Sequence, residues 1–487
     1  MSVSLGLMSH MSLTLVLDIG KTHAKLLLID SSGEVVARQC HANASEQANG
    51  YMALGVAALT QWLLTSIPLL PRRADISDIS ITTHGAAFCV LNDDGLVLPP
   101  MDYEWDGYGE FRSQFQQRAS VFDETGSPAL PLGLNAGLQL AWLKHVKPQD
   151  WSSVRHVLPY AQYWAWWFCA HMASEVSSLG CHTHLWSPHE HSHSSWAWSE
   201  GLDVLTPAVQ PAWSDLGQLR PELVACLGLP HHTQVKVGAH DSNACLARYL
   251  HTMPGATVVS TGTWVVIMAT HGQPVALDPH RDELLNVSVE GQCIPTGRFM
   301  GGREYALLSG DADVVLADIG HLLQVLKEGW RATPSFCDAG GPFAMQTGKV
   351  WRDEQVVALN DVPSTLRPAL AALYAAETTV HIIRHLSGDQ LTPVILEGPL
   401  SYNEAYVAAV AALLERYAVW RSTDELEGTA RGAWMLAQWT QRQSFQTGLS
   451  LVQPNASVQH CLAAYHEPNA AFTHPRIPPA ARTRQSA

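Results

Sequence analysis

The sequence of 487 residues has little positive charge. Lys and Arg total 29 against 44 Asp and Glu, which gives a formal net charge of −15, and the basic residues form no block along the chain. A partner such as nucleic acid or an anionic membrane requires a concentrated positive surface. The composition therefore predicts no nucleic-acid partner and no membrane partner.

Cysteine is also scarce and unpatterned. The nine cysteines are odd in number, lie far apart and include no CxxC pair. A disulfide framework or a zinc ribbon needs paired cysteines at short, regular spacings. The pattern instead predicts reduced thiols in a cytoplasmic protein.

Long apolar runs are missing as well. The densest aromatic cluster, YWAWWFCA at 163–170, is far shorter than the roughly 18 apolar residues of a membrane helix. The first eleven residues lack the basic and apolar regions of a signal peptide. We expect residues 1–11 to be a disordered extension and the Pro-rich residues 476–487 to be a disordered tail.

The clearest positive feature is the stretch Leu13–Val36, which reads as a strand, the polar turn DIGKTHAK, a second strand and an SSGE turn. Its backbone amides and Asp18 are suited to hold a phosphate and its metal ion. A weaker echo, TVVSTGTWVVIMATHGQPV, begins at Thr257. Two such hairpins predict a duplicated fold that holds one nucleotide from both sides.

Strand and helix patterns alternate along the chain, which predicts α/β layers with parallel or mixed sheets. Residues 50–67 have helical apolar spacing, whereas 76–91 read as strands interrupted by THGAA. The aromatic residues of 157–170 fit a buried helix, which we favour, and also fit stacking on a sugar ring. A long helix at 365–385 and a strand at 394–398 follow.

Residues 233–250 combine a strand, a GAHD turn and a helix. Gly238 permits the tight turn, and Ser242 with Asn243 can cap the helix that begins at Ala244. Asp241 could itself be only a helix cap. Its position directly before the second phosphate-type hairpin favours a catalytic carboxylate.

The run CHTHLWSPHEHSHSSW at 181–196 contains five histidines. These residues alternate with Ser and Pro, do not sit four apart on a helix and form no HExxH motif. The pattern favours a polar surface loop over a metal site.

The order of the motifs DIGKT, THG, GAHD, STGTW, GGRE, VILEG and EGTARGA resembles the FGGY family of carbohydrate kinases, within the actin-like ATPase superfamily. The resemblance covers about residues 12–475. It implies two actin-like (ribonuclease H-like) α/β domains, 12–248 and 249–475, with mixed five-stranded sheets flanked by helices and an active site in the interdomain cleft. It also implies a phosphotransferase that uses ATP and Mg²⁺ on a small-molecule sugar, and it is compatible with a homodimer.

Residue roles follow from the same resemblance. Asp18 matches the metal position, and Asp241 matches the general base that also contacts the sugar. The other substrate positions are His84, Gly85, Glu104, Asp106 and Gln162. The nucleotide positions are Gly20, Lys21, Thr22, Lys25, Thr261, Gly262, Thr263, Glu397, Gly398, Pro399 and Asn403, and Gly428 and Gly432 resemble the glycines of the last motif.

Within the family, ITTHGAAFCVLNDDG and YWAWWFCAHMASEVSS are most similar to L-rhamnulokinase-like ketose kinases. Ala87 and Gln162 stand where those kinases tend to carry Asp, and PMDYEWDGY lacks an Arg that is often found there. The expected substrate is a ketose resembling L-rhamnulose or L-fuculose. Xylulose, ribulose or a glycerol-like polyol stay open, as does a non-enzymatic actin-like nucleotide switch protein.

Overall fold

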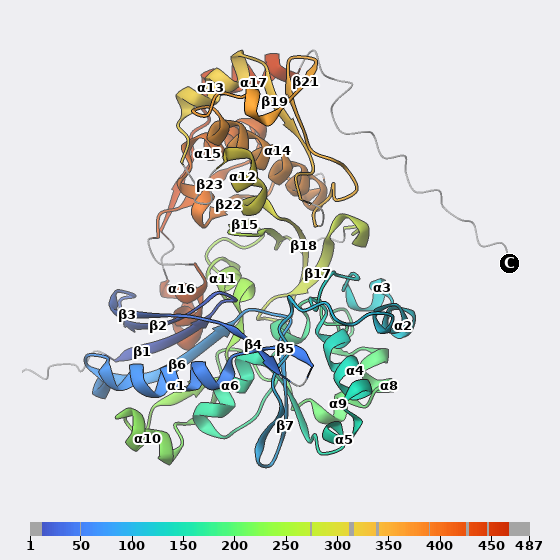
Figure 1. The fold of residues 1–487 in the computed structure, drawn as a ribbon. Helices are drawn as coiled ribbons and strands as arrows, with labels where there is room; N and C mark the ends of the chain where they lie inside the picture. Colours follow the sequence, from blue (N-terminus) through green and yellow to red (C-terminus); the bar gives the residue numbers. More distant parts are fainter. Residues whose placement is uncertain are drawn as a thin grey trace, which may run out of the picture.

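The computed structural model describes residues 12–466 except 49, 273–274, 311–315, 338–339, 389, 425–427 and 446–447. Two α/β lobes lie one above the other (Figure 1). This confirms the predicted two-domain architecture built on mixed sheets. The expected disordered extension 1–11 and tail 476–487 lie outside the described residues.

The sheet of the first lobe is mixed and has seven strands. Its order is β12 (Asp215–Gln218), β13 (Gln234–Lys236), β6 (Ile76–Thr83), β1 (Leu13–Ile19), β2 (His23–Asp30) and β3 (Val35–Ala42), and β14 (Ala239–His240) also pairs with β6. The central strand β1 runs antiparallel to β2 and parallel to β6. Every residue of β1 is buried, because both faces of the sheet are covered.

The second sheet repeats this arrangement. Its order is β17 (Glu283–Val287), β18 (Cys293–Phe299), β16 (Val265–Ala269), β15 (Thr257–Thr261), β22 (Val394–Glu397), β23 (Val419–Ser422) and β24 (Leu449–Leu451). The strand β15 runs antiparallel to β16 and parallel to β22, as β1 does with β2 and β6. The predicted duplication of the two hairpins is therefore confirmed.

The predicted number of five strands per sheet was wrong, since both sheets have seven. The short strands β12, β17 and β24 add antiparallel edges. The fifth strand of the first sheet is split into β13 and β14, which both pair with β6. The split occurs at Gly238, whose φ of +83° breaks the extended backbone.

Helices cover the sheets and build the parts of each lobe outside them. In the first lobe they are α1 (Val56–Ser66), α2 (Phe111–Arg118), α3 (Phe122–Thr125), α4 (Ala136–Val146), α5 (Pro148–Trp151), α6 (Tyr160–Cys169), α7 (Val176–Leu179), α8 (Ser195–Ser199), α9 (Leu202–Leu205) and α10 (Pro221–Leu227). In the second they are α12 (Gly301–Ser309), α13 (Ile319–Lys327), α14 (Arg367–Ser387), α15 (Glu404–Leu413) and α17 (Ala456–His466). Trp164 and Phe168 of the aromatic helix α6 are fully buried in the first core.

Three local predictions were wrong. The helix expected to begin at Ala244, capped by Ser242 and Asn243, begins at Asp241, with His240 as its N-cap. The helix expected over 50–67 starts only at Val56, because Tyr51–Leu54 forms a strand, β5, that pairs with β4 (Ser45–Ala48). The His-rich run is not a surface loop over its first part: residues 181–188 are all buried. Among the described residues, no group of three or more His, Cys, Asp or Glu could hold a metal ion.

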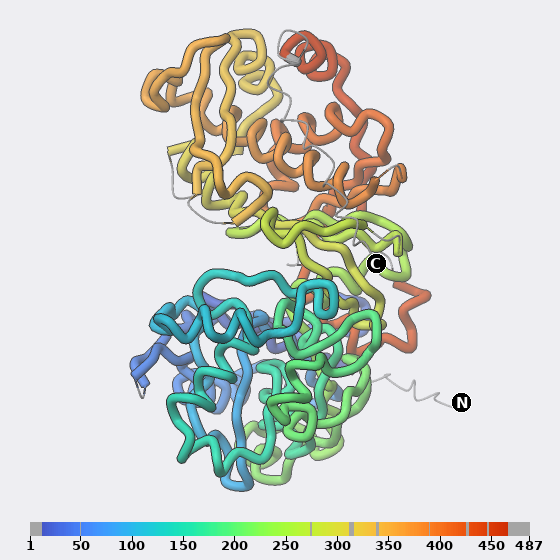
Figure 2. Tube along the Cα trace, turned by 90° about the vertical axis from the view of Figure 1, so that its right-hand side faces the viewer, coloured from blue at the N-terminus to red at the C-terminus, as the bar shows by residue number. Residues whose placement is uncertain are grey.

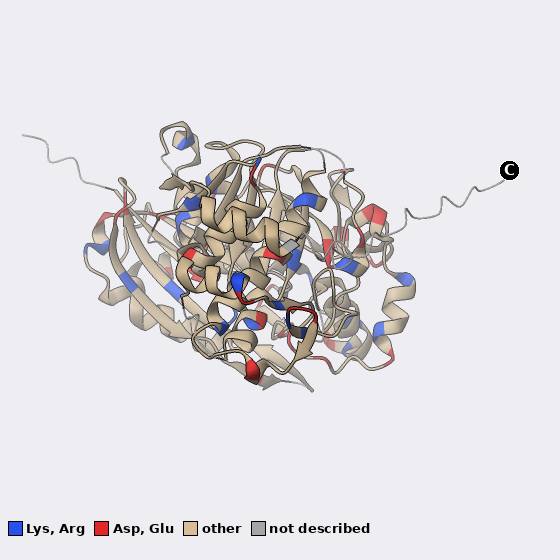
Figure 3. Cartoon of the chain, turned by 90° about the horizontal axis from the view of Figure 1, so that it is seen from above, with Lys and Arg blue, Asp and Glu red and all other residues tan. Residues whose placement is uncertain are grey.

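Charged residues of both signs are spread over the molecule, as Figure 3 shows in a view from above. Within the part of the chain that is described, no helix has the length and apolarity to span a bilayer. All nine cysteines are free thiols.

Two helices, called here the exchanged helices, lie where the lobes meet (Figures 1 and 2), and each contacts the half of the chain that does not contain it. The helix α11 (Asp241–Leu250) follows the first sheet, yet its Leu246 and Tyr249 pack in a cluster with residues of the second sheet. The helix α16 (Gly428–Ala437) follows the second sheet, yet Ala433 and its neighbours pack on β1 and β2 of the first. The expected division after residue 248 thus falls inside α11.

The two exchanged helices touch backbone to backbone. A Cβ atom added at Gly432 would lie 1.7 Å from the carbonyl oxygen of Ala244. Only glycine fits at this crossing. The Cβ atom of any other residue would collide with a backbone carbonyl oxygen, which cannot swing aside as a flexible side chain can.

We expect Gly432→Ala to cost about 1–3 kcal/mol of stability because the added methyl group forces α11 and α16 apart. Differential scanning fluorimetry should show a lower Tm. The matched control is Gly320→Ala, a helical and exposed glycine of α13, which should leave the Tm unchanged or raise it slightly. Equal Tm values for the two variants would contradict the role given to Gly432.

Candidate functional site

A cavity of about 270 Å³ lies between the lobes. Both halves of the chain line it: His84, Gly85, Ala86, Tyr103, Leu134, Cys181, His182, His240, Asp241 and Ser242 from the first, and Ser260, Thr261, Gly262, Trp264, Val266, Leu284, Asn286, Thr296, Arg298 and Thr429 from the second. The volume suits a small molecule. The cavity therefore lies between the lobes, at the position for which an active site was predicted.

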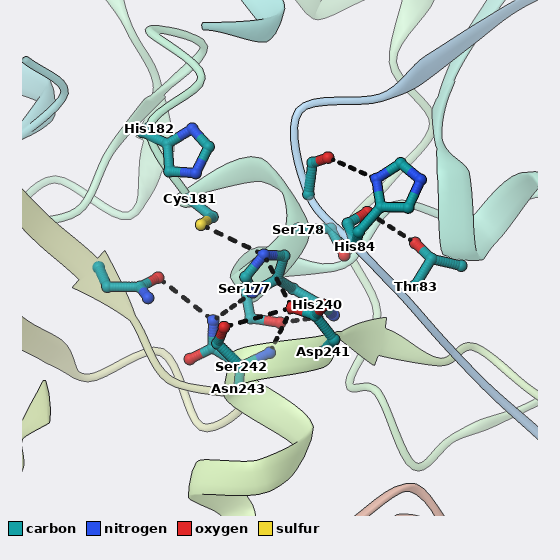
Figure 4. A network of polar contacts seen from close by, with 12 residues as sticks. Thr83, His84, Ser177, Ser178, Cys181, His182, His240, Asp241, Ser242 and Asn243 are labelled. Carbon is teal, nitrogen blue, oxygen red and sulfur yellow. Dashed lines mark hydrogen bonds and ion pairs between the residues drawn. The ribbon is translucent and has the colours of Figure 1, made fainter. Parts of the chain in front are cut away.

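Asp241 is the first residue of α11 and lies in the cavity wall (Figure 4). Its Oδ1 accepts hydrogen bonds from the backbone N of Ser242 at 2.6 Å and from the Ser242 hydroxyl at 3.2 Å. The Nε2 atom of His240 lies 3.3 Å from the same oxygen. These contacts fix Oδ1. The side chain as a whole is still 29% exposed, so a ligand in the cavity can reach it.

Cys181 and His240 form a buried pair beside Asp241, with 3.5 Å between Sγ and Nε2 (Figure 4). Burial raises the pKa of the Cys181 thiol, but the charges of His182 and His240 outweigh it and lower the pKa to about 5. Burial lowers the pKa of His240, but the charges of Cys181 and Asp241 raise it to about 9. Both shifts favour the charged forms, a thiolate at Cys181 and an imidazolium at His240.

His84 follows β6 and closes another side of the cavity. Its Nδ1 lies 2.9 Å from the carbonyl oxygen of Gly85, and burial lowers the pKa of the ring. A neutral imidazole that donates from Nδ1 keeps Nε2 as an acceptor. The ring packs edge-on against Tyr103, with 5.4 Å between the ring centroids.

The first phosphate-type turn follows β1. Asp18 is 6% exposed and pairs across the sheet with Lys25 in register. The backbone N of Gly20 donates to the carbonyl oxygen of His23 at 2.9 Å, which closes the turn. Thr22 is exposed at its tip.

Lys21, in this turn, is held by two carboxylates. Its Nζ lies 2.7 Å from Asp102 and 3.3 Å from Glu104. Burial raises the pKa of Asp102, but hydrogen bonds from Lys21 and Ser45 lower it below its usual value. The two carboxylates thus neutralise the charge of Lys21, which was predicted to lie near the phosphates. The sequence analysis did not predict Asp102 as its partner.

The second phosphate-type turn is packed closely against two glycines. The Thr261 hydroxyl donates to the carbonyl oxygen of Glu397 at 2.5 Å and accepts from the backbone N of Leu400 at 3.0 Å. Cβ atoms added at Gly302 and Gly398 would lie 2.2 Å and 2.1 Å from the carbonyl oxygens of Gly262 and Thr261. Thr263 accepts a hydrogen bond from the backbone of Gly302.

Two of the residues predicted to bind the nucleotide make contacts within the protein. The Glu397 carboxylate pairs with Arg248 of α11 at 2.7 Å, buried between the lobes. The Asn403 side chain caps α15 by accepting from Tyr406 and donates to the hydroxyl of Tyr305. Pro399 begins a short 3₁₀ helix, Pro399–Tyr402, between them.

Three of the residues predicted to bind the sugar do not line the cavity. Gln162 is fully buried and donates to the carbonyl oxygens of Val237 and Gly238 at 3.1 and 3.0 Å, where it supports the turn before Asp241. Glu104 pairs with Lys21, and Asp106 pairs with Arg112.

The cavity instead presents residues that sequence reasoning missed, among them Tyr103, Trp264 and Arg298. Tyr103 lies in the aromatic segment that was recognised, and Trp264 belongs to the recognised STGTW motif. No sequence signal marks Arg298, because β18 is not itself part of a motif.

We expect iodoacetamide to alkylate Cys181 before the buried Cys89 and Cys245, because burial raises the pKa of both these thiols while Cys181 is a thiolate in a cavity wall. The rate should change little between about pH 6 and pH 8, since the thiolate is fully formed above its pKa. Peptide mass spectrometry measures the site and the rate. A Cys181 rate that climbs steeply over that range, or earlier labelling of Cys245, would contradict the ion pair.

Known proteins match both lobes. Residues 13–247 match the N-terminal domain of the FGGY family of carbohydrate kinases, and residues 253–445 match the carbohydrate kinase FGGY C-terminal domain. An L-fuculokinase of Salmonella typhi is 25% identical over 280 residues, which are 53% of this chain. The chain spans only 57% of the length of that relative.

Two solved structures share the fold. A carbohydrate kinase from Novosphingobium aromaticivorans has a TM-score of 0.83 and 31% identity, over 93% of this chain and 97% of its own. A glycerol kinase of Plasmodium falciparum with ADP has a TM-score of 0.76 at 11% identity, over 96% of this chain and 99% of its own. The two family matches together cover most of the sequence, and the chain belongs to the FGGY family of carbohydrate kinases.

Proposed function

We propose that the protein is an ATP-dependent kinase that phosphorylates a hydroxyl group of a ketose resembling L-fuculose or L-rhamnulose. The observation that carries the proposal is the place of Asp241, in the wall of a sugar-sized cavity that also contains the second phosphate-type turn at Thr261 and Gly262. Family membership and the likeness to an L-fuculokinase support it. The free cysteines support a cytoplasmic location.

The residues present fit ATP and Mg²⁺. Glycine at 302 and 398 lets two other backbone segments approach the second turn, where a Cβ would collide with its carbonyl oxygens, and a compact turn of small residues of this kind is a setting in which backbone amides bind phosphate. Asp18 offers one carboxylate at the other turn, and Mg²⁺ commonly takes one or two carboxylates together with phosphate oxygens. Bound there, Mg²⁺ would supply neutralisation of phosphate charge.

In the proposed reaction Asp241 accepts the proton of the attacking sugar hydroxyl. The Oδ1 atom is occupied by Ser242 and His240, so the other carboxylate oxygen is the one that takes the proton. The Nε2 atom of His84 accepts a hydrogen bond from a sugar hydroxyl. The turns at Gly20–Thr22 and Thr261–Thr263 hold the phosphates in line, because phosphoryl transfer depends mainly on alignment and charge neutralisation.

Asp241→Asn should lower kcat by roughly 10²- to 10⁴-fold, the usual contribution of a general base, and leave the KM for ATP nearly unchanged. A coupled ADP-release assay measures both constants. Asp93→Asn, in an exposed turn, is the control and should behave as wild type. Turnover retained in Asp241→Asn would remove Asp241 from this role.

A panel of ketoses and polyols should separate the substrates. We expect L-fuculose or L-rhamnulose to support faster ADP release than xylulose, ribulose, glycerol or erythritol, because the aromatic and His-containing wall suits a larger sugar. A thermal-shift screen run in parallel should show stabilisation by the same sugar. A protein that responds to nucleotide alone and turns over no sugar would instead be a nucleotide switch.

A further inference from the structure

Arg298 is a buried cation in the cavity wall of the second lobe. It lies on β18 and is 7% exposed. Its Nε donates to Oδ1 of Asp282 at 2.9 Å, and Oδ2 of Asp282 accepts from the backbone N of Gly341 at 3.1 Å. The guanidinium lies over the ring of Trp264, 4.6 Å from its centroid. These contacts fix the side chain before any ligand binds.

One atom of this fixed group lacks a partner. Nη2 of Arg298 is buried and makes no hydrogen bond to any described residue. Buried N–H groups of native proteins are nearly always hydrogen-bonded. A rigid, buried and unsatisfied donor in a cavity wall is the feature expected of a ligand contact, because the ligand supplies the missing acceptor.

The surroundings of Arg298 favour an uncharged acceptor. Asp282 already neutralises the guanidinium through the short contact at Nε. Other acidic and basic groups in the wall include the Asp241 carboxyl group and the Cys181–His240 pair, whose pKa shifts favour a thiolate and an imidazolium. Because Arg298 pairs with Asp282 and Cys181 pairs with His240, Asp241 is left as the uncompensated charge of the wall, and it would repel a carboxylate on the substrate.

We propose that Arg298 is a substrate-binding residue of the second lobe, whose Nη2 donates a hydrogen bond to a carbonyl or hydroxyl oxygen of a neutral ketose. This inference rests on the proposed kinase function and deepens it. Asp241 and His84 bind the sugar from the first lobe and Arg298 binds it from the second. The sugar itself therefore joins the two walls of the cavity, and sugar acids such as aldonates are poor substrates.

The test compares Arg298→Met and Arg298→Lys with wild type on the best sugar of the panel. Arg298→Met should raise the KM for that sugar roughly 10- to 100-fold, the range for a lost hydrogen bond from a charged donor, with the KM for ATP within about twofold. Arg298→Lys should recover part of the loss, since lysine keeps the charge but not the planar fork. Arg281→Met is the matched control: Arg281 is also largely buried and ion-paired, with Glu283, but lies outside the cavity wall.

The outcomes are distinguishable. A sugar KM of Arg298→Met within twofold of wild type, or equal losses for Arg298→Met and Arg281→Met, would overturn the proposal while wild-type turnover keeps the kinase function. An aldonate phosphorylated better than any ketose would overturn the neutral substrate class. A wild type that neither turns over nor is stabilised by any sugar would remove the kinase function, and this proposal with it. If Arg298→Met fails to fold, Arg298→Lys provides the test. A sugar-induced Tm shift smaller than that of wild type supports the proposal, and a shift equal to that of wild type overturns it.

Discussion

The contact between α11 and α16 is the constraint on which the rest of this structure depends. Each helix follows a strand of one sheet in the sequence and packs against residues of the other sheet. The two helices cross at Gly432, where their backbones are in contact. Each lobe has a main apolar core from its own half of the chain, and the two helices add smaller apolar clusters that need both halves. The exchange costs conformational freedom at a glycine, and the burial of two apolar helix faces offsets that cost.

The same exchange positions the site. Asp241 is the first residue of α11, and Thr429 near the start of α16 lies in the same cavity wall. The ion pairs of Arg248 with Glu397 and Asp424, at 2.7 and 3.2 Å, bind α11 to the second half of the chain. Because removal of one partner would leave a buried charge, this contact fixes the helix whose first residue carries the proposed base.

Motif order was a better guide to backbone than to side-chain contacts. The two hairpins, the GAHD turn and the strand at VILEG were all found where the pattern predicts them. Lys21, Glu397 and Gln162 were assigned to ligands, but their side chains contact other parts of the protein. A sequence pattern gives the residue type at a turn, whereas the direction of a long side chain depends on which carboxylate or carbonyl lies within reach.

The sequence alone determined the duplication of the two phosphate-type hairpins, the mixed α/β layers and the place of Asp241 at the mouth of a strand–turn–helix unit, because these follow from local apolar spacing and turn chemistry. Only the tertiary structure decided the helix exchange, the Cys181–His240 ion pair and the presence of Arg298 in the cavity wall. Each of these joins residues more than fifty positions apart in the sequence. Such contacts arise from how the sheets and helices pack, and no local pattern of residues encodes them.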